Sequence, residues 1–307
     1  MSNPITQQHY LGLPEAMFTA TAPAAAPAPK LLALNQRLLK QYRLNSDWFS
    51  SADALAIFGG NADYPTQPLA MAYAGHQFGG YSPLLGDGRA HMLGQLQTGN
   101  GSWLDVQLKG SGATPYSRGG DGKATLSSAL REYLISEAMA GLGIPTTNSL
   151  AIIGTGEFVM REQPQPGGIV VRTAQSHLRV GSFQYAAANL KRDELQELAD
   201  FAIQHHFPEL EDSENPYSAL IETVAARQAA LIPQWMLVGF IHGVMNTDNM
   251  SIVGETIDFG PCAFMDEFIP SKTFSSIDHQ GRYAWNQQGS IAYWNIARFA
   301  ETLLPLL

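Results

Sequence analysis

One short polar segment constrains this chain more than any other. It comprises residues 242–249, HGVMNTDN, and is followed closely by the Asp-Phe-Gly of residues 258–260. Between the two, residues 250–257 alternate apolar and polar side chains, which predicts a tight β-hairpin. Such a hairpin would bring Asn249 beside Asp258, and paired oxygen ligands suit a hard divalent cation such as Mg²⁺. Asn and Asp also favour ordinary turns, so the segment by itself fits a plain hairpin equally well.

Length, composition and charge indicate a globular protein. The chain has 307 residues, enough for one large domain or two lobes, and its 45% hydrophobic and 15% charged residues are ordinary values. The formal net charge of -9 argues against a protein dedicated to nucleic acid. A pocket can still be locally basic, so a phosphorylated ligand remains compatible with this charge.

Cysteine and apolar patterns bear on the compartment. Cys262 is the single cysteine, which excludes an internal disulfide and a cysteine-rich zinc site and fits a reducing compartment. We interpret it as a small buried residue. The first residues lack the pattern of a secretory signal, and no apolar run reaches the length of a membrane span. We therefore expect a cytoplasmic monomer that binds neither nucleic acid nor membranes.

The order of predicted elements indicates an α+β fold. Residues 1–30 end in an Ala/Pro-rich run and are expected to form an extended arm. A β-rich part with one long helix follows, and an α-rich part comes last. The predicted strands are residues 89–97, 103–110, 146–154, 157–162 and 168–174, and the predicted helices are residues 31–42, 51–60, 126–142, 191–207, 217–240 and 291–304.

Charged residues stand where several of these elements end. Lys109 ends the second predicted strand, Glu132 lies early in the helix that follows, and Arg172 and Arg179 lie at and beyond the last strand. Two arginines this close can clamp a phosphate, or they can pair with surface acids. Lys109 can equally be an edge-strand lysine, and Glu132 a solvent-facing residue near a helix N-terminus.

The order of these parts resembles that of a protein kinase, with one residue out of place. In the kinase loop pattern H-R-D-x-x-x-x-N, His242 takes the His place and Asn249 the metal-binding Asn place, but Val244 stands where the base belongs. Asp248 is the only carboxylate in the loop that could replace that base. Upstream, Gly-Asp-Gly-Arg at residues 86–89 replaces the kinase glycine loop, so we expect a nucleotide to be held differently.

From about residue 68 to the end, the chain resembles the selenoprotein O (SelO) pseudokinases. The resemblance rests on the stretches AYAGHQFGGYSPLLGDGRA, QLKGSGATPYSRGGDGKATL, REYLISEAM, GIVVRTAQSHLRVGSF and HGVMNTDNMSI, followed by DFGP. It implies a protein-kinase-like bilobal fold, with a nucleotide-binding N-lobe at residues 31–180 and a C-lobe that carries the catalytic loop at residues 181–307. Family members usually continue with more C-lobe helices, so we expect this chain to be C-terminally short.

The resemblance also implies an activity, that of a bacterial protein adenylyltransferase. Such enzymes bind ATP flipped relative to kinases and, with Mg²⁺ or Mn²⁺, transfer AMP to Ser, Thr or Tyr hydroxyls of protein substrates, which can include the enzyme itself. Catalysis then needs positive charge at the departing phosphates and a base near the acceptor. The alternatives are a protein uridylyltransferase that uses UTP, an atypical kinase in which Asp248 replaces the lost base, and an inactive nucleotide-binding scaffold.

The resemblance assigns a role to each matching residue. It places Asp248 as the proton acceptor, and Asn249 and Asp258 as metal ligands, with Asp258 also at the nucleotide. Lys109 is expected to contact phosphate and to pair with Glu132. The residues expected to line the nucleotide pocket are Gly86, Gly88, Arg89, Asp121 and Gly122, and those expected at the outer phosphates are Arg172 and Arg179.

Overall fold

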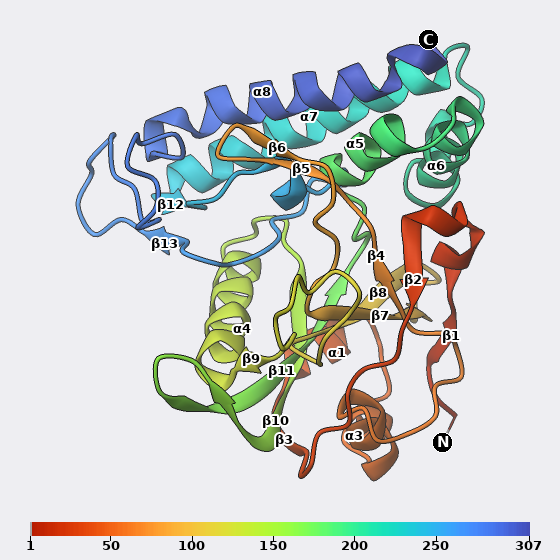
Figure 1. Ribbon diagram of the computed structural model, residues 1–307, viewed down its shortest axis with the longest axis vertical. Coiled ribbons are helices and arrows are strands. Elements are labelled where there is room, and N and C mark those ends of the chain that lie inside the picture. The colour runs from red at the N-terminus through yellow and green to blue at the C-terminus, as the bar shows by residue number, and fades with distance from the viewer. Residues whose placement is uncertain (1) are drawn as a thin grey trace. The chain divides into compact units, whose positions relative to one another are not determined.

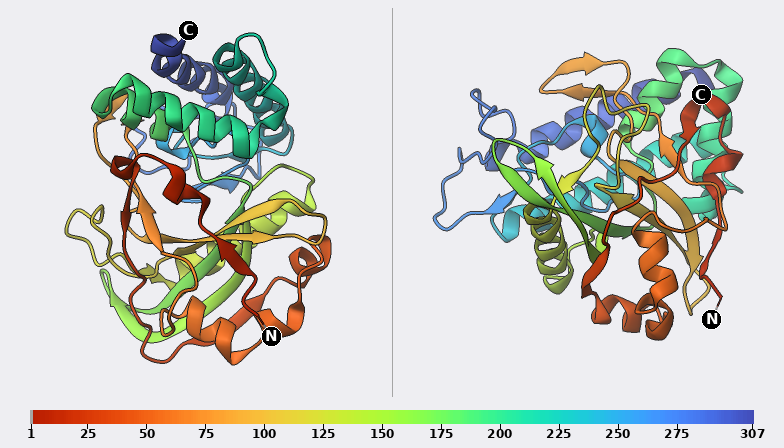
Figure 2. Two further views of the ribbon diagram at one scale, coloured as in Figure 1. Left: turned by 90° about the vertical axis from the view of Figure 1, so that its right-hand side faces the viewer. Right: turned by 60° about the horizontal axis from the view of Figure 1, so that its bottom comes forward.

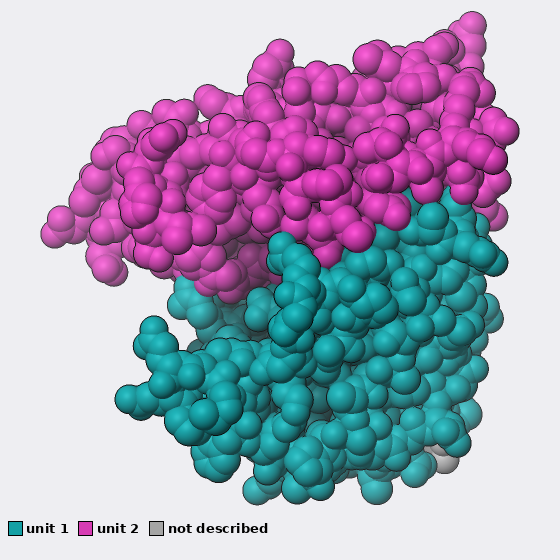
Figure 3. Space-filling model, viewed as in Figure 1, with its two compact units in different colours: residues 1–72, 86–138, 147–175 teal, residues 73–85, 139–146, 176–307 magenta. Residues whose placement is uncertain are grey.

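The structure is a computed structural model that describes residues 2–307, and it divides into two compact units (Figure 3). Unit 1 comprises Met1–Ala72, Gly86–Ala138 and Thr147–Gln175, of which Met1 lies outside the described residues. Unit 2 comprises Tyr73–Leu85, Met139–Thr146 and Ser176–Leu307. The units therefore interleave along the sequence, whereas the predicted lobes are contiguous.

Unit 1 is built on one nine-stranded antiparallel sheet (Figure 1). Its strands run in the order β2-β4-β7-β8-β11-β10-β3, with β1 added to β7 and β9 added to β11. The predicted strands at residues 89–97 and 103–110 are confirmed as β7 and β8, which pair through a tight turn. The strands are β1 (Ile5–Gln7), β2 (Phe18–Ala20), β3 (Lys30–Leu34), β4 (Leu69–Met71), β7 (Ala90–Gln97), β8 (Trp103–Lys109), β9 (Ala124–Thr125), β10 (Asn148–Met160) and β11 (Pro164–Ala174).

The helix predicted at residues 31–42 is wrong in its first half. Residues 30–34 form β3, which pairs with β10, and the helix α1 (Gln36–Gln41) begins only after Asn35. The Asn35 side chain accepts a hydrogen bond from the Leu38 amide at 3.0 Å, so it caps the helix and marks the break. An apolar run this short satisfies both a strand and a helix, and the pairing with β10 decides in favour of the strand.

The strands predicted separately at residues 146–154 and 157–162 are one strand, β10. Its pairing with β11 shifts in register between Gly154 and Phe158, and Gly156 in that interval has φ +79°. This is a β-bulge, in which a glycine adopts a conformation that other residues disfavour. The bulge explains why the sequence resembles a turn there. The resulting β10–β11 hairpin is the long green pair in Figure 2.

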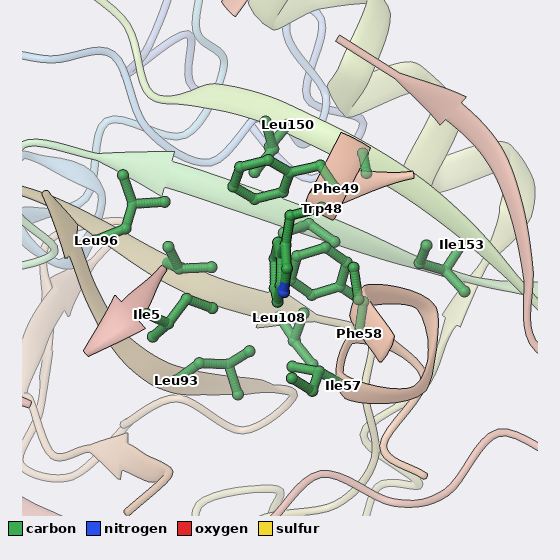
Figure 4. Packing of buried hydrophobic residues seen from close by; sticks show 14 of the residues in the cluster. Ile5, Trp48, Phe49, Ile57, Phe58, Leu93, Leu96, Leu108, Leu150 and Ile153 are labelled. Atoms are coloured by element: carbon green, nitrogen blue, oxygen red, sulfur yellow. The ribbon is translucent and has the colours of Figure 1, made fainter. Parts of the chain in front are cut away.

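Three more helices complete unit 1. The helices α2 (Ser46–Phe49) and α3 (Ala52–Phe58) pack on one face of the sheet through a shared hydrophobic cluster, and α3 lies within the helix predicted at residues 51–60. Their aromatic residues Trp48, Phe49 and Phe58 pack edge-to-face or stacked, with Trp48 and Phe49 ring centroids 4.9 Å apart (Figure 4). The long helix predicted at residues 126–142 is confirmed as α4 (Leu126–Gly141).

The first thirty residues contribute to this sheet and its core. Ile5, on β1, is buried in the same hydrophobic cluster as Trp48, and Tyr10 and Met17 are also buried. Residues 21–29, the Ala/Pro-rich part of the predicted arm, have no regular secondary structure. The arm is therefore attached at both ends by strand pairing, through β1 and β2 on one side and β3 on the other.

A buried histidine in unit 1 gives a prediction about acid stability. His91 donates from Nδ1 to Ser111 Oγ at 2.8 Å, its Nε2 has no partner, and burial lowers its pKa to about 4. Neutral His91 therefore stabilises the fold above its ordinary pKa of 6.5, and this stabilisation is lost as the pH falls towards 4. When the pH is lowered from 7 to 4.5, the free energy of unfolding measured in urea should fall by about 2–3 kcal/mol more for the wild type than for His91→Asn, whose side chain cannot titrate. Parallel curves for the two proteins would contradict this.

Unit 2 is mainly helical. The helices predicted at residues 191–207, 217–240 and 291–304 are confirmed to within a few residues as α6, α7 and α8. None of the helices in the part of the chain that the structure describes is long and apolar enough to cross a membrane. The elements of unit 2 are β5 (Gly75–Gln77), β6 (Gly80–Ser82), α5 (Val180–Asn189), α6 (Arg192–His206), α7 (Pro216–Leu237), β12 (Phe240–Ile241), β13 (Ala263–Phe264) and α8 (Gln288–Leu303). Together with the sheet of unit 1, they confirm a mixed α+β fold.

Candidate active site

In unit 1, the predicted residues Lys109, Glu132 and Arg172 form one buried ion network. Lys109 Nζ lies 2.8 Å from Glu132 Oε2, and Arg172 Nη2 lies 2.7 Å from Glu132 Oε1. The exposed fractions of the three side chains are 12%, 7% and 3%, so solvent screens these pairs weakly. The predicted pair of Lys109 with Glu132 is therefore present, and Glu132 is not the solvent-facing residue of the simpler interpretation. Arg172, expected at a phosphate, also binds this carboxylate.

The Gly-Asp-Gly-Arg turn is held by its aspartate. Asp87 is buried, and its Oδ2 accepts hydrogen bonds from Gln107 Nε2 and from the Met71 amide, both at 3.2 Å. Gly86 has φ +70°, and a Cβ there would lie 2.3 Å from the Tyr116 ring. Only glycine fits such a position. Asp87 is thus structural, while Arg89 extends into solvent from the start of β7.

The predicted pocket residues Asp121 and Gly122 lie in the long loop between β8 and β9. Arg161 binds the Asp121 carboxylate with two nitrogens, at 2.8 and 3.1 Å, and these hydrogen bonds lower the pKa of Asp121. Both side chains are exposed, so the pair contributes little to stability. Gly122 has φ +65°, and a Cβ there would lie 2.0 Å from the Gly112 carbonyl oxygen. The loop is therefore folded on itself through a glycine contact.

In unit 2, Asp248 is a buried carboxylate with an open oxygen. It lies in a short 3-10 helix, Thr247–Asn249, and is 7% exposed. Its Oδ2 accepts a weak hydrogen bond from Gln77 Nε2 at 3.4 Å, and its Oδ1 has no hydrogen-bond partner. Burial raises the pKa of Asp248 to about 6, although the positive charge of Arg179 opposes the rise. A carboxylate with this pKa can accept a proton near neutral pH.

Arg179 joins Asp248 to Asp258. Its Nη1 donates to the Asp248 carbonyl oxygen at 2.9 Å and lies 3.5 Å from Asp258 Oδ2. The guanidinium also lies 4.4 Å from the centroid of the Tyr73 ring, a cation–π contact. The arginine is 3% exposed, so its charge acts on both aspartates with little screening. The structure thus brings together three of the predicted site residues in unit 2.

The hairpin predicted over residues 250–257 is not formed. Ser251 instead makes an antiparallel bridge with Arg179, and Thr256 makes a parallel bridge with Thr146. The segment does turn at Gly254, which has φ +79°. Each arm therefore pairs with a different part of unit 2. The alternation of apolar and polar residues is real, but it reflects pairing with these distant segments.

His242 lies in the core of unit 2, at the start of the loop of residues 242–249. Its Nε2 lies 2.8 Å from the Ile257 carbonyl oxygen, and its ring stacks on Trp235 at 5.5 Å. Burial lowers its pKa, which keeps the ring neutral and suits a donor at Nε2. Gln288 of α8 accepts a hydrogen bond from the His242 amide at 3.0 Å. His242 therefore acts as a structural residue that ties the start of this loop to Ile257 and to α8.

The β5–β6 hairpin contributes contacts that the sequence did not indicate. Gln77 donates to Asp248, and a Cβ on Gly75 would lie 2.5 Å from Asp248 Oδ1. The Gln77 contact spans 171 residues of sequence. The only signal in the sequence is the glycine-rich texture of residues 71–88, which does not specify what the hairpin touches.

The donor chemistry at Asn249 and Asp258 fits a hard divalent cation. Asn249 Nδ2 donates to the Val244 carbonyl oxygen at 2.9 Å, which orients the amide and leaves its oxygen available as a ligand. Asp258 adopts φ +62°, a conformation that non-glycine residues rarely take and that is often found at functional sites. Among residues 2–307, no group of three or more His, Cys, Asp or Glu side chains could hold a metal ion. A cation at this pair would therefore need oxygen ligands from elsewhere, as nucleotide phosphates and water provide.

Comparison with known proteins agrees with the predicted resemblance. The model of a family described as "Protein adenylyltransferase SelO" matches residues 5–307. A curated relative from Shewanella denitrificans, named "Protein nucleotidyltransferase YdiU", is 62% identical over 308 residues, which cover 100% of this chain and 61% of the relative. Relatives of the same name from Anoxybacillus flavithermus and Mycolicibacterium smegmatis are each 59% identical, over 97% and 92% of this chain and 62% and 59% of their own lengths.

These matches cover nearly all of this chain, whereas the chain spans about three-fifths of the length of the curated relatives it matches. The match extends over both units, from β1 to the end of α8. It includes every residue assigned a role above. The chain therefore belongs to the family described as protein adenylyltransferase SelO.

Proposed function

We propose that this protein is a metal-dependent protein adenylyltransferase that transfers AMP from ATP to Ser, Thr or Tyr hydroxyls of proteins. The observation that carries the proposal is Asp248, a buried carboxylate whose Oδ1 has no partner and whose pKa is raised to about 6. It lies four residues beyond Val244, which stands where a kinase has its base. Membership of the family supports the same activity.

In the proposed reaction, Asp248 acts as the general base. Its Oδ1 accepts the proton of the acceptor hydroxyl while that oxygen bonds to the α-phosphorus of ATP and the bond to pyrophosphate breaks. Arg179 donates a hydrogen bond to the Asp248 carbonyl oxygen, and its charge favours the ionised carboxylate against the effect of burial. As the family resemblance implies, Arg179 would also bind the outer phosphates. Asn249 and Asp258 would hold Mg²⁺ or Mn²⁺, which supplies positive charge to the phosphates.

The residues of unit 1 would serve the nucleotide. Lys109 and Arg172 would present positive charge to the outer phosphates, and Glu132 would position both side chains. Gly86 and Gly88 would allow close approach of the backbone, and Arg89, Asp121 and Gly122 would line the pocket. In this assignment the Asp121–Arg161 pair orders the long loop.

Labelled nucleotides separate this function from its alternatives. Protein incubated with Mg²⁺ or Mn²⁺ should acquire label from α-labelled ATP and none from γ-labelled ATP, and its intact mass should increase by one AMP. Transfer of γ-label would identify an atypical kinase, and an increase by one UMP with UTP in place of ATP would identify a uridylyltransferase. Binding of nucleotide without any transfer would identify an inactive scaffold.

Gly75 offers a test of the position of Asp248. A methyl group at Gly75 would lie 2.5 Å from Asp248 Oδ1, so Gly75→Ala must displace this carboxylate. A displacement of this size should lower AMP transfer by about 10- to 100-fold. Gly289→Ala on α8 is the matched control, since a Cβ there meets nothing within 4 Å. Equal transfer rates for the two variants would show that the open oxygen of Asp248 does not take part.

A further inference from the structure

Cationic and aromatic side chains of the β5–β6 hairpin, of α8 and of the segment before α8 form a cluster. Trp294 of α8 is its centre, and the guanidinium carbons of Arg282 and Arg298 lie 4.9 and 5.1 Å from the centroid of the Trp294 ring. His76 packs edge-on against Trp294 at 5.1 Å, and Tyr81 lies 5.0 Å from His76. We call these five residues the Trp294 cluster.

The charge of the Trp294 cluster is only partly neutralised. Arg298 pairs with Glu301, whereas Arg282 forms no ion pair with any of residues 2–307. The Nε atoms of both arginines are buried and have no hydrogen-bond partner. Burial lowers the pKa of His76, and the charges of Arg298 and Arg282 lower it further. Arg282 is therefore a cation without an ion pair on a chain whose net charge is -9, and the Asp278 carboxylate accepts a hydrogen bond from its backbone amide.

Hydrogen bonds join the Trp294 cluster to the loop that carries Asp248, the proposed base. The His76 amide donates to Thr247 Oγ1 at 2.7 Å, and Gln184 bridges the His76 ring and the Thr247 hydroxyl, at 2.8 and 2.5 Å. The next residue of β5, Gln77, donates to Asp248 itself. Neighbouring residues of one short strand therefore touch the cluster and the base. Successive side chains of a strand point to opposite faces, so a peptide segment that reaches both the cluster and the base must pass around this three-residue strand.

We propose that the Trp294 cluster binds a carboxylate side chain of the protein substrate, a few residues from the acceptor hydroxyl. The proposal rests on the proposed function, since it names the kind of substrate segment that reaches Asp248. The Arg282 guanidinium forms no ion pair with an acidic residue among residues 2–307. Arginine binds carboxylates through two parallel hydrogen bonds. The indole of Trp294 holds this guanidinium in place, so little side-chain entropy is lost on binding. Tyr81, which is 43% exposed, offers an aromatic surface beside it.

A purely structural role for the same residues makes a different prediction. If the arginines only pack on Trp294, their loss should lower stability without any dependence on the charge of an added peptide. If the cluster binds a carboxylate, affinity should follow the charge of the peptide even with the wild-type protein. A comparison of peptides therefore tests the proposal without requiring that any variant fold.

The test uses three short fluorescein-labelled peptides with one central threonine in a Gly/Ala background. They differ only in the flanking positions, which carry glutamate, glutamine or lysine. Fluorescence anisotropy in the absence of nucleotide should show the glutamate peptide binding at least about tenfold more tightly than the other two. The variant Arg282→Ala/Arg298→Ala should lose this preference. Arg227→Ala should keep it, since Arg227 also lies over an aromatic ring, Phe207, at 4.1 Å but outside the cluster.

Peptide binding and AMP transfer can fail independently of each other. Equal binding of the glutamate and glutamine peptides would overturn the proposal, and so would a double variant that keeps the preference for glutamate. Arginine-dependent binding of a single-stranded oligonucleotide in place of the peptide would also overturn it. Charge-dependent binding without transfer of AMP to any threonine would support the surface and contradict the proposed function. AMP transfer that ignores both the peptide charge and the double variant would support the proposed function and contradict the surface.

Discussion

Replacing Asp248 by asparagine is expected to lower the rate of AMP transfer by about 10²- to 10⁴-fold, the usual contribution of a general base. Asparagine keeps the shape of the side chain and its contact with Gln77, but its oxygen cannot take up the proton of the acceptor hydroxyl. The rate of the wild type should fall below about pH 6, where Asp248 becomes protonated. Transfer of α-label to protein, followed from pH 5 to pH 8, measures both effects.

The same substitution is expected to stabilise the protein near neutral pH. The pKa of Asp248 is raised from 3.8 to about 6, so the fold is stabilised by the protonated carboxyl, and this stabilisation is lost as the pH rises through 6. Above that pH, the wild type keeps an ionised carboxylate buried with one oxygen unpartnered. The measurement is the free energy of unfolding in urea, without metal or nucleotide. The advantage of Asp248→Asn over the wild type should be about 2–3 kcal/mol larger at pH 8 than at pH 4.

The control for both measurements is Asp200→Asn. Asp200 is exposed on α6, outside residues 242–260, and accepts a hydrogen bond from the Tyr217 hydroxyl at 2.9 Å. Its replacement should leave the transfer rate unchanged and give no gain in stability that grows with pH. Transfer by Asp248→Asn within threefold of the wild-type rate would exclude Asp248 as the base. A variant that is both inactive and less stable at pH 8 would mean that Asp248 supports the fold instead.

The elements that the sequence predicted well are those whose signals are local. The β7–β8 hairpin follows from two alternating runs joined by a Gly-rich turn, and α4 follows from helical spacing that ends near Gly141. The wrong predictions depend on pairing between distant segments. Residues 30–34 form a strand because β10 lies beside them, and residues 250–257 do not pair with each other because other segments of unit 2 pair with each arm.

In the candidate site, too, the residues that share a linear motif could be predicted, whereas contacts between distant segments could not. The loop from His242 to Asp258 could be found because a linear motif contains its residues, and the ion pair of Lys109 with Glu132 was expected from the family resemblance. The close approach of Gly75 to Asp248 could not be predicted from the sequence. A glycine whose backbone conformation is ordinary gives no indication of which residue it contacts. Nor could spacing decide whether Arg172 faces a phosphate or an acid, since a guanidinium binds either.

The position of Arg172 on Glu132 leads to a second large expected effect, since one carboxylate neutralises two cations in the interior of unit 1. Glu132→Gln keeps the shape of the side chain but removes the negative charge that both Lys109 and Arg172 bind, and breaking a buried pair in this way costs about 3–5 kcal/mol. Urea unfolding without nucleotide should show a loss of this size. The double variant Glu132→Gln/Arg172→Met should recover part of it, because it also removes the more deeply buried cation.

Glu137, on the same helix, is the matched control for Glu132. It binds Arg37 at 2.7 Å, but this pair lies at the surface, where the Glu137 side chain is 24% exposed and the Arg37 side chain 40%. Surface pairs of this kind contribute at most about 1 kcal/mol, so Glu137→Gln should cost far less than Glu132→Gln. Equal losses would mean that burial does not determine the strength of the Glu132 network. A stable Glu132→Gln protein that no longer transfers AMP would instead show that Glu132 acts by positioning Lys109 and Arg172 for the nucleotide, with little part in holding the sheet to α4.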